Sequence, residues 1–210
     1  MRVKICGITS VADARLAEES GADAIGLIMA EGSKRQLAVS AAAEIAGSVG
    51  PLLSVIGVFR DQPPEFVIEA AARLRLAAVQ LHGSEDREFV RAVREKVRVI
   101  KAVAYRPGLS ASELASWPAD AVLLDAVSPG AGVPFDWQAA AELAGWPGLI
   151  LAGGLNPANV TEAVAVLRPA AVDVASGVEA TAGVKNPELV RSFVSAARTA
   201  GRVSTGGSVS

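Results

Sequence analysis

A cysteine and an aspartate stand at the ends of two apolar runs, and together they could transfer protons. Cys6 closes a run that begins at Val3, and Asp125 closes a run that begins at Ala121. A carboxylate at the end of a buried strand is costly unless it is paired or used. A thiol and a carboxyl group on opposite sides of one cavity would supply a base and an acid for moving protons on a substrate.

Each of these residues also has a simpler interpretation. A lone cysteine is commonly a small buried hydrophobe, and Asp125 could cap a helix or turn. The place of Cys6 at a strand end, directly before glycine, favours function. Lys4 lies two residues earlier and shares its face of the strand, one layer deeper. We expect the ammonium to favour the thiolate and to lower the thiol pKa, and to pair with Asp173 across the interior.

Glycines after two neighbouring apolar runs predict a phosphate site. Gly153 and Gly154 follow one run, and Ser176 and Gly177 follow the next. Glycine leaves backbone N–H groups open to an anion, although it also serves ordinary tight turns. Two such loops in consecutive units favour phosphate binding, so we predict that these four residues contact a phosphorylated substrate.

Two further side chains are candidates for binding. Arg35 follows Lys34 after the second apolar run, and its planar fork suits a substrate carboxylate. The alternative is a solvated charged loop. His82 is the only histidine and could titrate near neutrality. No triad partner is evident in the sequence, so we expect a structural or substrate-contacting role for His82.

The elements that must position these residues form a repeated alternation. Short β-branched runs are followed by Ala-rich stretches of helical period. The expected strands are Val3–Cys6, Ala24–Met29, Leu53–Phe59, Ala77–Leu81, Val97–Val103, Ala121–Asp125, Leu149–Ala152 and Ala171–Ala175. The expected helices are Val11–Ser20, Ala41–Ser48, Pro64–Leu74, Glu85–Lys96, Ser110–Ser116, Trp137–Leu143, Pro157–Leu167 and Pro187–Thr199.

Eight such units predict an α/β fold of one domain, a (β/α)8 TIM barrel. A doubly wound open sheet is the alternative, but it would not explain why the units are so short and so similar. In a barrel the carboxyl ends of all strands meet at one mouth, which would bring the candidate residues together. We expect the barrel over residues 1–200 and a flexible Gly/Ser-rich tail over 201–210.

Composition excludes several classes of function. A net charge of −2 gives no electrostatic case for nucleic acid or an anionic membrane as partner. One cysteine excludes an internal disulfide and a Cys-cluster zinc site, and one histidine counts against a metal-dependent epimerase. No signal peptide and no apolar stretch long enough for a bilayer are visible, which predicts a cytoplasmic protein.

Taken in order, the motifs resemble the phosphoribosylanthranilate isomerase family of tryptophan biosynthesis. The resemblance runs from the first expected strand to the eighth expected helix, and so covers nearly the whole chain. The segments that carry it are Lys4–Thr9, Gly21–Ala24, Val79–Gly83, Leu124–Ala126, Phe135–Trp137, Leu151–Leu155 and Ser176–Glu179.

The resemblance implies an isomerase that needs neither metal nor organic cofactor. The family converts N-(5-phosphoribosyl)anthranilate into 1-(2-carboxyphenylamino)-1-deoxyribulose 5-phosphate by an Amadori rearrangement. Carried over by motif, Cys6 would be the general base and Asp125 the general acid. Arg35 would hold the anthranilate carboxylate, while Gly154 and Ser176–Gly177 would hold the phosphate through backbone N–H groups.

Two loops depart from the family pattern. The family usually has Ser-Pro-Arg where this chain has Ser33–Arg35, often Pro at Glu31, and usually Ser at Ala38. It commonly has Gly-Gly-Thr-Gly-Lys-Thr where this chain has Pro129–Pro134. Both departures leave the expected acid and base in place and bear on substrate fit. The alternatives are therefore a related phosphosugar isomerase or a phosphate-binding barrel without turnover. The sequence is equally compatible with a monomer and with a homodimer.

Overall fold

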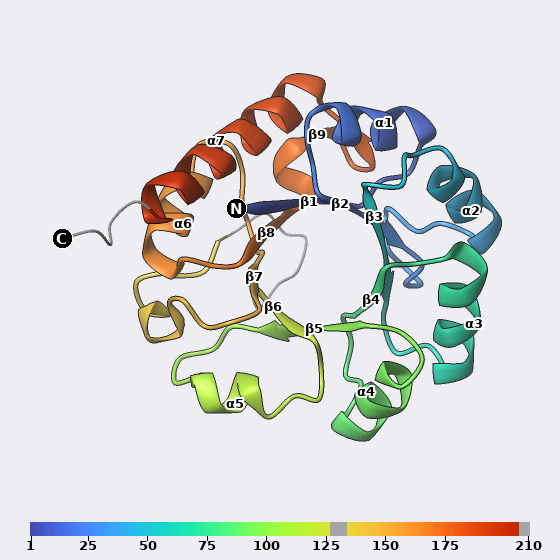
Figure 1. Ribbon diagram of the computed structural model, residues 1–210, viewed down its shortest axis with the longest axis horizontal. Coiled ribbons are helices and arrows are strands. Elements are labelled where there is room, and N and C mark those ends of the chain that lie inside the picture. Colours follow the sequence, from blue (N-terminus) through green and yellow to red (C-terminus); the bar gives the residue numbers. More distant parts are fainter. Residues whose placement is uncertain (127–133, 206–210) are drawn as a thin grey trace.

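The chain folds into a closed barrel of eight parallel strands surrounded by helices (Figure 1). A computed structural model describes residues 1–126 and 134–205. The strands pair in chain order, and β1 closes the ring against β8. They are β1 (Arg2–Cys6), β2 (Ala24–Ile28), β3 (Ser54–Phe59), β4 (Ala78–Leu81), β5 (Val99–Ala104), β6 (Ala121–Asp125), β7 (Leu149–Leu151) and β8 (Ala171–Val174). The predicted single-domain TIM barrel is confirmed.

The helices form the outer ring seen in Figure 1. The α-helices are α1 (Val11–Glu19), α2 (Val39–Gly47), α3 (Pro64–Leu74), α4 (Arg87–Arg94), α5 (Ala111–Ala115), α6 (Val160–Leu167) and α7 (Pro187–Thr205). Two 3-10 helices, η1 (Ala141–Leu143) and η2 (Ser176–Val178), and a hairpin of β9 (Glu179–Thr181) and β10 (Val184–Lys185) complete the described elements. None of the described helices is long and apolar enough to cross a membrane.

Helix starts follow the capping residues of the sequence. Ser10 accepts a hydrogen bond from the Asp13 N–H at the start of α1, a contact typical of a serine N-cap. At α4 the cap is Asp86, which accepts from the Phe89 N–H. The expected helix start at Pro157 was three residues too early, because the Asn156 side chain caps a turn that precedes α6.

The helix expected over Trp137–Leu143 is wrong. The segment makes turns and the short 3-10 helix η1, with bonds such as Ala140 N–H to the Trp137 carbonyl. Turns and 3-10 helices are frequent in short connecting segments of this kind. Conversely, α7 continues through residues 201–205, where we expected a flexible tail. The remainder of that tail, 206–210, lies outside the described residues and stays a prediction.

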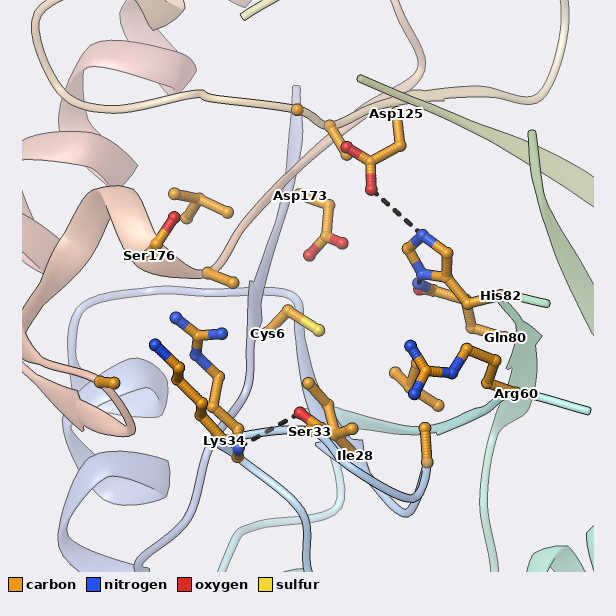
Figure 2. A pocket seen from close by; sticks show the side chains of 18 of the residues that line it. Cys6, Ile28, Ser33, Lys34, Arg60, Gln80, His82, Asp125, Asp173 and Ser176 are labelled. Atoms are coloured by element: carbon orange, nitrogen blue, oxygen red, sulfur yellow. Dashed lines mark hydrogen bonds and ion pairs between the residues drawn. The ribbon is translucent and has the colours of Figure 1, made fainter. Parts of the chain in front are cut away.

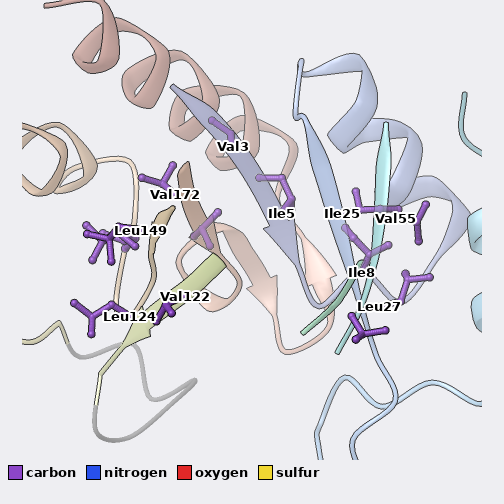
Figure 3. Packing of buried hydrophobic residues seen from close by; sticks show 14 of the residues in the cluster. Val3, Ile5, Ile8, Ile25, Leu27, Val55, Val122, Leu124, Leu149 and Val172 are labelled. Carbon is purple, nitrogen blue, oxygen red and sulfur yellow. The ribbon is translucent and has the colours of Figure 1, made fainter. Parts of the chain in front are cut away.

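Alternation along each strand divides the barrel into two layers. The outward side chains, such as Val3, Ile5 and Val172, pack under the helices (Figure 3). The inward side chains include an apolar cluster of Ile56, Ala78, Ile100, Ala102, Leu123 and Ala152. Cys6 lies on the inward face with Lys4, because side chains two residues apart in a strand share a face.

A buried ion pair joins β5 to the loop that follows β4. The Lys101 ammonium lies 2.7 Å from a carboxylate oxygen of Glu85, and both side chains are almost fully buried. Glu85 also accepts hydrogen bonds from the backbone N–H groups of Asp61 and Gly83. The pair therefore anchors the loop that begins at His82.

Replacing Lys101 with methionine should destabilise the fold by about 3–5 kcal/mol, because Glu85 would keep a buried charge without a partner. Urea unfolding would measure this change. Adding Glu85→Gln should restore part of the loss, because it removes the unpaired charge. Arg94→Met, which breaks the exposed Arg94–Asp120 pair, is the control and should cost about 1 kcal/mol or less. An equal loss in both single variants would contradict the argument.

Candidate active site

A cavity of about 460 Å³ opens at the carboxyl ends of the strands, where barrel enzymes place their chemistry. Its walls include the ends of β1, β4, β6 and β8 and the loops after β2, β7 and β8. The residues predicted for chemistry or binding that line it are Cys6, Arg35, His82, Asp125, Gly153, Gly154 and Ser176. The tertiary structure thus brings together side chains separated by up to 170 positions in the sequence.

Cys6 lies at the centre of the cavity floor (Figure 2). Lys4 lies beneath it, with its ammonium 3.0 Å from Asp173, so the predicted Lys4–Asp173 pair is confirmed. Gly26 on β2 leaves the space that these groups occupy. A Cβ atom there would lie 2.6 Å from the Cys6 sulfur and 3.1 Å from the Lys4 nitrogen. Only glycine fits beside the thiol and the ammonium.

The net pKa shift of the thiol differs from the sequence-based expectation. Burial raises the pKa of Cys6 and outweighs the lowering by Lys4, while Asp173 raises it further. The expected effect of the ammonium is present, but desolvation of the thiolate is larger. For Lys4, burial disfavours the ammonium, but Asp173 and Cys6 outweigh this and raise its pKa. Lys4 therefore stays charged beside the thiol.

Asp125 closes β6 on another side of the cavity from Cys6 (Figure 2). One carboxylate oxygen accepts the Ala126 N–H at 2.8 Å, and the other lies 3.1 Å from the His82 Nε2 atom. Gly153 packs against this group, since a Cβ atom there would lie 3.0 Å from the carboxylate. Gly153 therefore leaves space for the acid candidate while also lining the cavity.

Arg35 reaches the cavity from the loop after β2 and is held by a buried carboxylate. Its Nε and Nη2 atoms each lie 2.6 Å from an oxygen of Glu179 in a two-pronged contact. Glu179 also pairs with Lys185 at 3.0 Å. Burial opposes ionisation of Glu179, but hydrogen bonds from Arg35 and Lys185 outweigh it and lower its pKa. This contact fixes the edge of the guanidinium that carries Nε and Nη2. The third nitrogen, Nη1, lies on the opposite edge.

The two glycine loops meet at the rim. Gly153 and Gly154 both have positive φ angles of 81° and 68°, which glycine adopts without strain. Gly177 does not line the cavity. It packs against the Leu155 carbonyl so closely that a Cβ atom would clash with that oxygen. Gly177 therefore joins the loop after β8 to the loop after β7.

Several residues of the site had no role assigned from the sequence. Glu179 was part of a recognised motif, but its partner Arg35 is 144 positions away. Gln80 joins Lys4 to His82, and Arg60 lines the cavity while donating to the Glu31 carbonyl. The signal that could have found Gln80 is its polar side chain in an otherwise apolar strand, which the strand alternation turns inward.

The first of the two divergent loops contributes residues to this cavity. Gly32, Ser33 and Lys34 line it, and the Ser33 hydroxyl accepts the Arg35 N–H at 3.2 Å. The second departure, 129–134, lies outside the described residues except for Pro134. Within residues 1–126 and 134–205, no group of three or more His, Cys, Asp or Glu side chains could hold a metal ion.

Comparison with known proteins gives one consistent result. The family model described as N-(5'-phosphoribosyl)anthranilate (PRA) isomerase matches residues 3–196. The N-(5'-phosphoribosyl)anthranilate isomerase of Geotalea uraniireducens (strain Rf4) is 45% identical over 201 residues, which cover 94% of this chain and 98% of that protein.

Solved structures agree with this match. The phosphoribosyl anthranilate isomerase of Thermus thermophilus superimposes with a TM-score of 0.89 at 44% identity, covering 95% of this chain and 99% of that one. A second structure, of a phosphoribosyl anthranilate isomerase in complex with reduced 1-(o-carboxyphenylamino)-1-deoxyribulose 5-phosphate, has a TM-score of 0.83 at 38% identity with the same coverage.

Proposed function

The chain belongs to the N-(5'-phosphoribosyl)anthranilate isomerase family, and we propose that its mouth cavity carries out the family's reaction with Cys6 as general base and Asp125 as general acid. The protein is an isomerase of tryptophan biosynthesis that acts on a phosphorylated small molecule. The observation that carries the assignment of roles is that Cys6 and Asp125 line one cavity from different strands.

The reaction needs one acid and one base. Asp125 gives its proton to the ribose ring oxygen, and the C1–O bond breaks to leave an open-chain imine. The Cys6 thiolate then removes the proton from C2, and the electron pair forms the enolamine. The enolamine tautomerises to the ketone. Each proton transfer by a positioned side chain typically accelerates its step by about 10²–10⁴-fold, so both groups contribute strongly.

The two ends of the substrate are bound by different parts of the rim. Arg35 holds the anthranilate carboxylate. The two-pronged contact with Glu179 supports this role, because it fixes the guanidinium and leaves its Nη1 atom outside that contact. Gly153, Gly154 and Ser176 contact the phosphate, with Gly177 holding their two loops together. His82 lines the cavity beside Asp125, the proposed acid. The monomeric or homodimeric state and the cytoplasmic location stay predictions.

A time course of phosphoribosylanthranilate fluorescence, with the substrate generated in situ, tests the function. Rapid loss of signal with the wild-type protein is the expected result. A binding-only barrel would leave the signal unchanged while the reduced product analogue still raised the melting temperature. That pattern would overturn the assignment of the reaction to this cavity.

Arg35→Ala should weaken binding of the reduced product analogue by about 10- to 100-fold, the loss expected for hydrogen bonds to a charged group. Titration calorimetry measures the Kd, and steady-state kinetics should show the rise mainly in KM. Lys34→Ala removes the neighbouring cation and is the control, with a smaller expected effect. An unchanged Kd for Arg35→Ala would mean that another group holds the carboxylate.

A further inference from the structure

A buried glutamine connects the two ends of the proposed acid–base pair. Gln80 is only 1% exposed and lies on the inward face of β4. Its Oε1 atom lies 3.0 Å from the Lys4 ammonium, and its Nε2 atom lies 3.0 Å from the His82 Nδ1 atom. The acid–base chemistry described above leaves this side chain without a role.

The orientation of the Gln80 amide follows from its neighbour. An ammonium group can only donate hydrogen bonds, so the amide atom that faces Lys4 must be the oxygen. The flipped amide would place two donors 3.0 Å apart in a buried site, where unpaired polar groups are costly. Lys4 is held in turn by Asp173 at 3.0 Å, so its position is fixed by a second contact.

This orientation determines the protonation of the histidine ring. The amide NH₂ group faces Nδ1 and can only donate, so Nδ1 must be an acceptor without a proton. A neutral imidazole then carries its proton on Nε2. Figure 2 shows Nε2 directed toward Asp125, at 3.1 Å from Oδ2. The ring therefore donates to the carboxyl group.

We propose that Gln80 is a positioning residue that, held by Lys4, fixes His82 as its neutral Nε2–H tautomer so that His82 orients Asp125. The carboxyl group is then held from both sides, by His82 at one oxygen and by the Ala126 N–H at the other. These donors keep it turned toward the cavity and stabilise the carboxylate that forms when the proton leaves. The significance for catalysis rests on the proposed role of Asp125; the tautomer itself does not.

The wild-type protein offers a direct test, because it contains one histidine. With ¹⁵N-labelled histidine, a long-range ¹H–¹⁵N spectrum gives one set of ring signals, and the protonated and unprotonated nitrogens have well-separated shifts. At neutral pH we expect Nε2 to be protonated and Nδ1 unprotonated. A proton on Nδ1, in either the neutral or the charged ring, overturns the proposal, whatever happens in any variant.

The variant Gln80→Glu reverses the bonding at Nδ1. Its carboxylate, close in size to the amide, accepts from Lys4 and from a proton on Nδ1, so we expect Nδ1 to become protonated. We also expect kcat to fall by about 10- to 100-fold, the effect of one misdirected hydrogen bond to a charged group, with little change in the Kd of the reduced product analogue. An unchanged ring signal in folded Gln80→Glu overturns the proposal.

A matched control separates charge from geometry. Gln138→Glu makes the same chemical change at an exposed position, and we expect no change in ring signals or kcat. A shift of the ring signals in Gln138→Glu as large as in Gln80→Glu would overturn the proposal. Full activity in Asp125→Asn would instead remove the acid role while the tautomer remains as measured, so the two failures are distinguishable.

Discussion

Replacing Cys6 with serine should lower kcat by about 10²–10⁴-fold, the usual contribution of a positioned base. Serine is close to cysteine in size, so it fits the tight space beside Gly26. A Cβ atom on residue 26 would lie only 2.6 Å from the Cys6 sulfur. Its hydroxyl group is a far weaker acid than a thiol, so almost none of it is ionised near neutrality. The expected loss of kcat would therefore result from removal of the base and not from a cavity or a steric clash.

Binding provides the control for this variant. The reduced product analogue should bind Cys6→Ser about as well as wild type, because the proposed contacts to phosphate and carboxylate lie elsewhere on the rim. Cys6→Ala should show the same loss of kcat with a small additional cavity. If Cys6→Ser turned over substrate at the wild-type rate, another group would have to remove the C2 proton.

The pH dependence should follow the ionisation of the same thiol. Burial raises the pKa of Cys6 above the ordinary value for cysteine, and the thiolate is the active form of the base. The value of kcat/KM should therefore increase with pH through the alkaline range in which the free enzyme loses this proton. If the residual activity of Cys6→Ser showed the same increase, the titrating group would not be Cys6.

Asp125→Asn is expected to lower kcat by about 10²–10⁴-fold with little change in binding of the analogue. The amide has nearly the same shape, but its single oxygen can accept from either His82 or the Ala126 N–H and not from both. It cannot give a proton to the ribose ring oxygen, so the ring stays closed. Stopped-flow turnover should show the loss of kcat, and calorimetric titration should show that binding of the analogue is nearly unchanged.

Arg35→Ala is the matched contrast to Asp125→Asn. One variant should change the Kd of the analogue and the other the rate of conversion, although both residues line the same cavity. Normal turnover in Asp125→Asn would remove Asp125 as the acid. The histidine beside it, His82, would then be the next group to test at the ring oxygen.

The alternation of residue types in the sequence was sufficient to predict the barrel. Every one of the eight expected strands is present, with ends within two residues of those observed. Parallel barrel strands are short and apolar, so they appear in the sequence as short apolar runs. The helices between them bury one face, so they appear as stretches of helical period. Polar side chains at strand ends then indicated Cys6 and Asp125, because a barrel gathers those ends at one mouth.

Local sequence signals were weakest where backbone conformation depends on contacts with distant segments. The helix expected at Trp137–Leu143 is instead a set of turns and one 3-10 helix, and the hairpin of β9 and β10 had no clear sequence signal. That hairpin brings Glu179 and Lys185 together. A two-stranded element of this size has little intrinsic stability, so its conformation depends on the barrel rim.

The partners of the candidate residues were decided by the tertiary structure. The sequence placed Arg35 and Glu179 in separate motifs, and their contact exists because the rim joins loops 144 positions apart. The thiol pKa could not be read from the neighbouring Lys4 alone, since the penalty of burial is set by everything packed around Cys6. Sequence position thus determined which residues reach the mouth, while packing and the closure of the barrel determined their partners and charges.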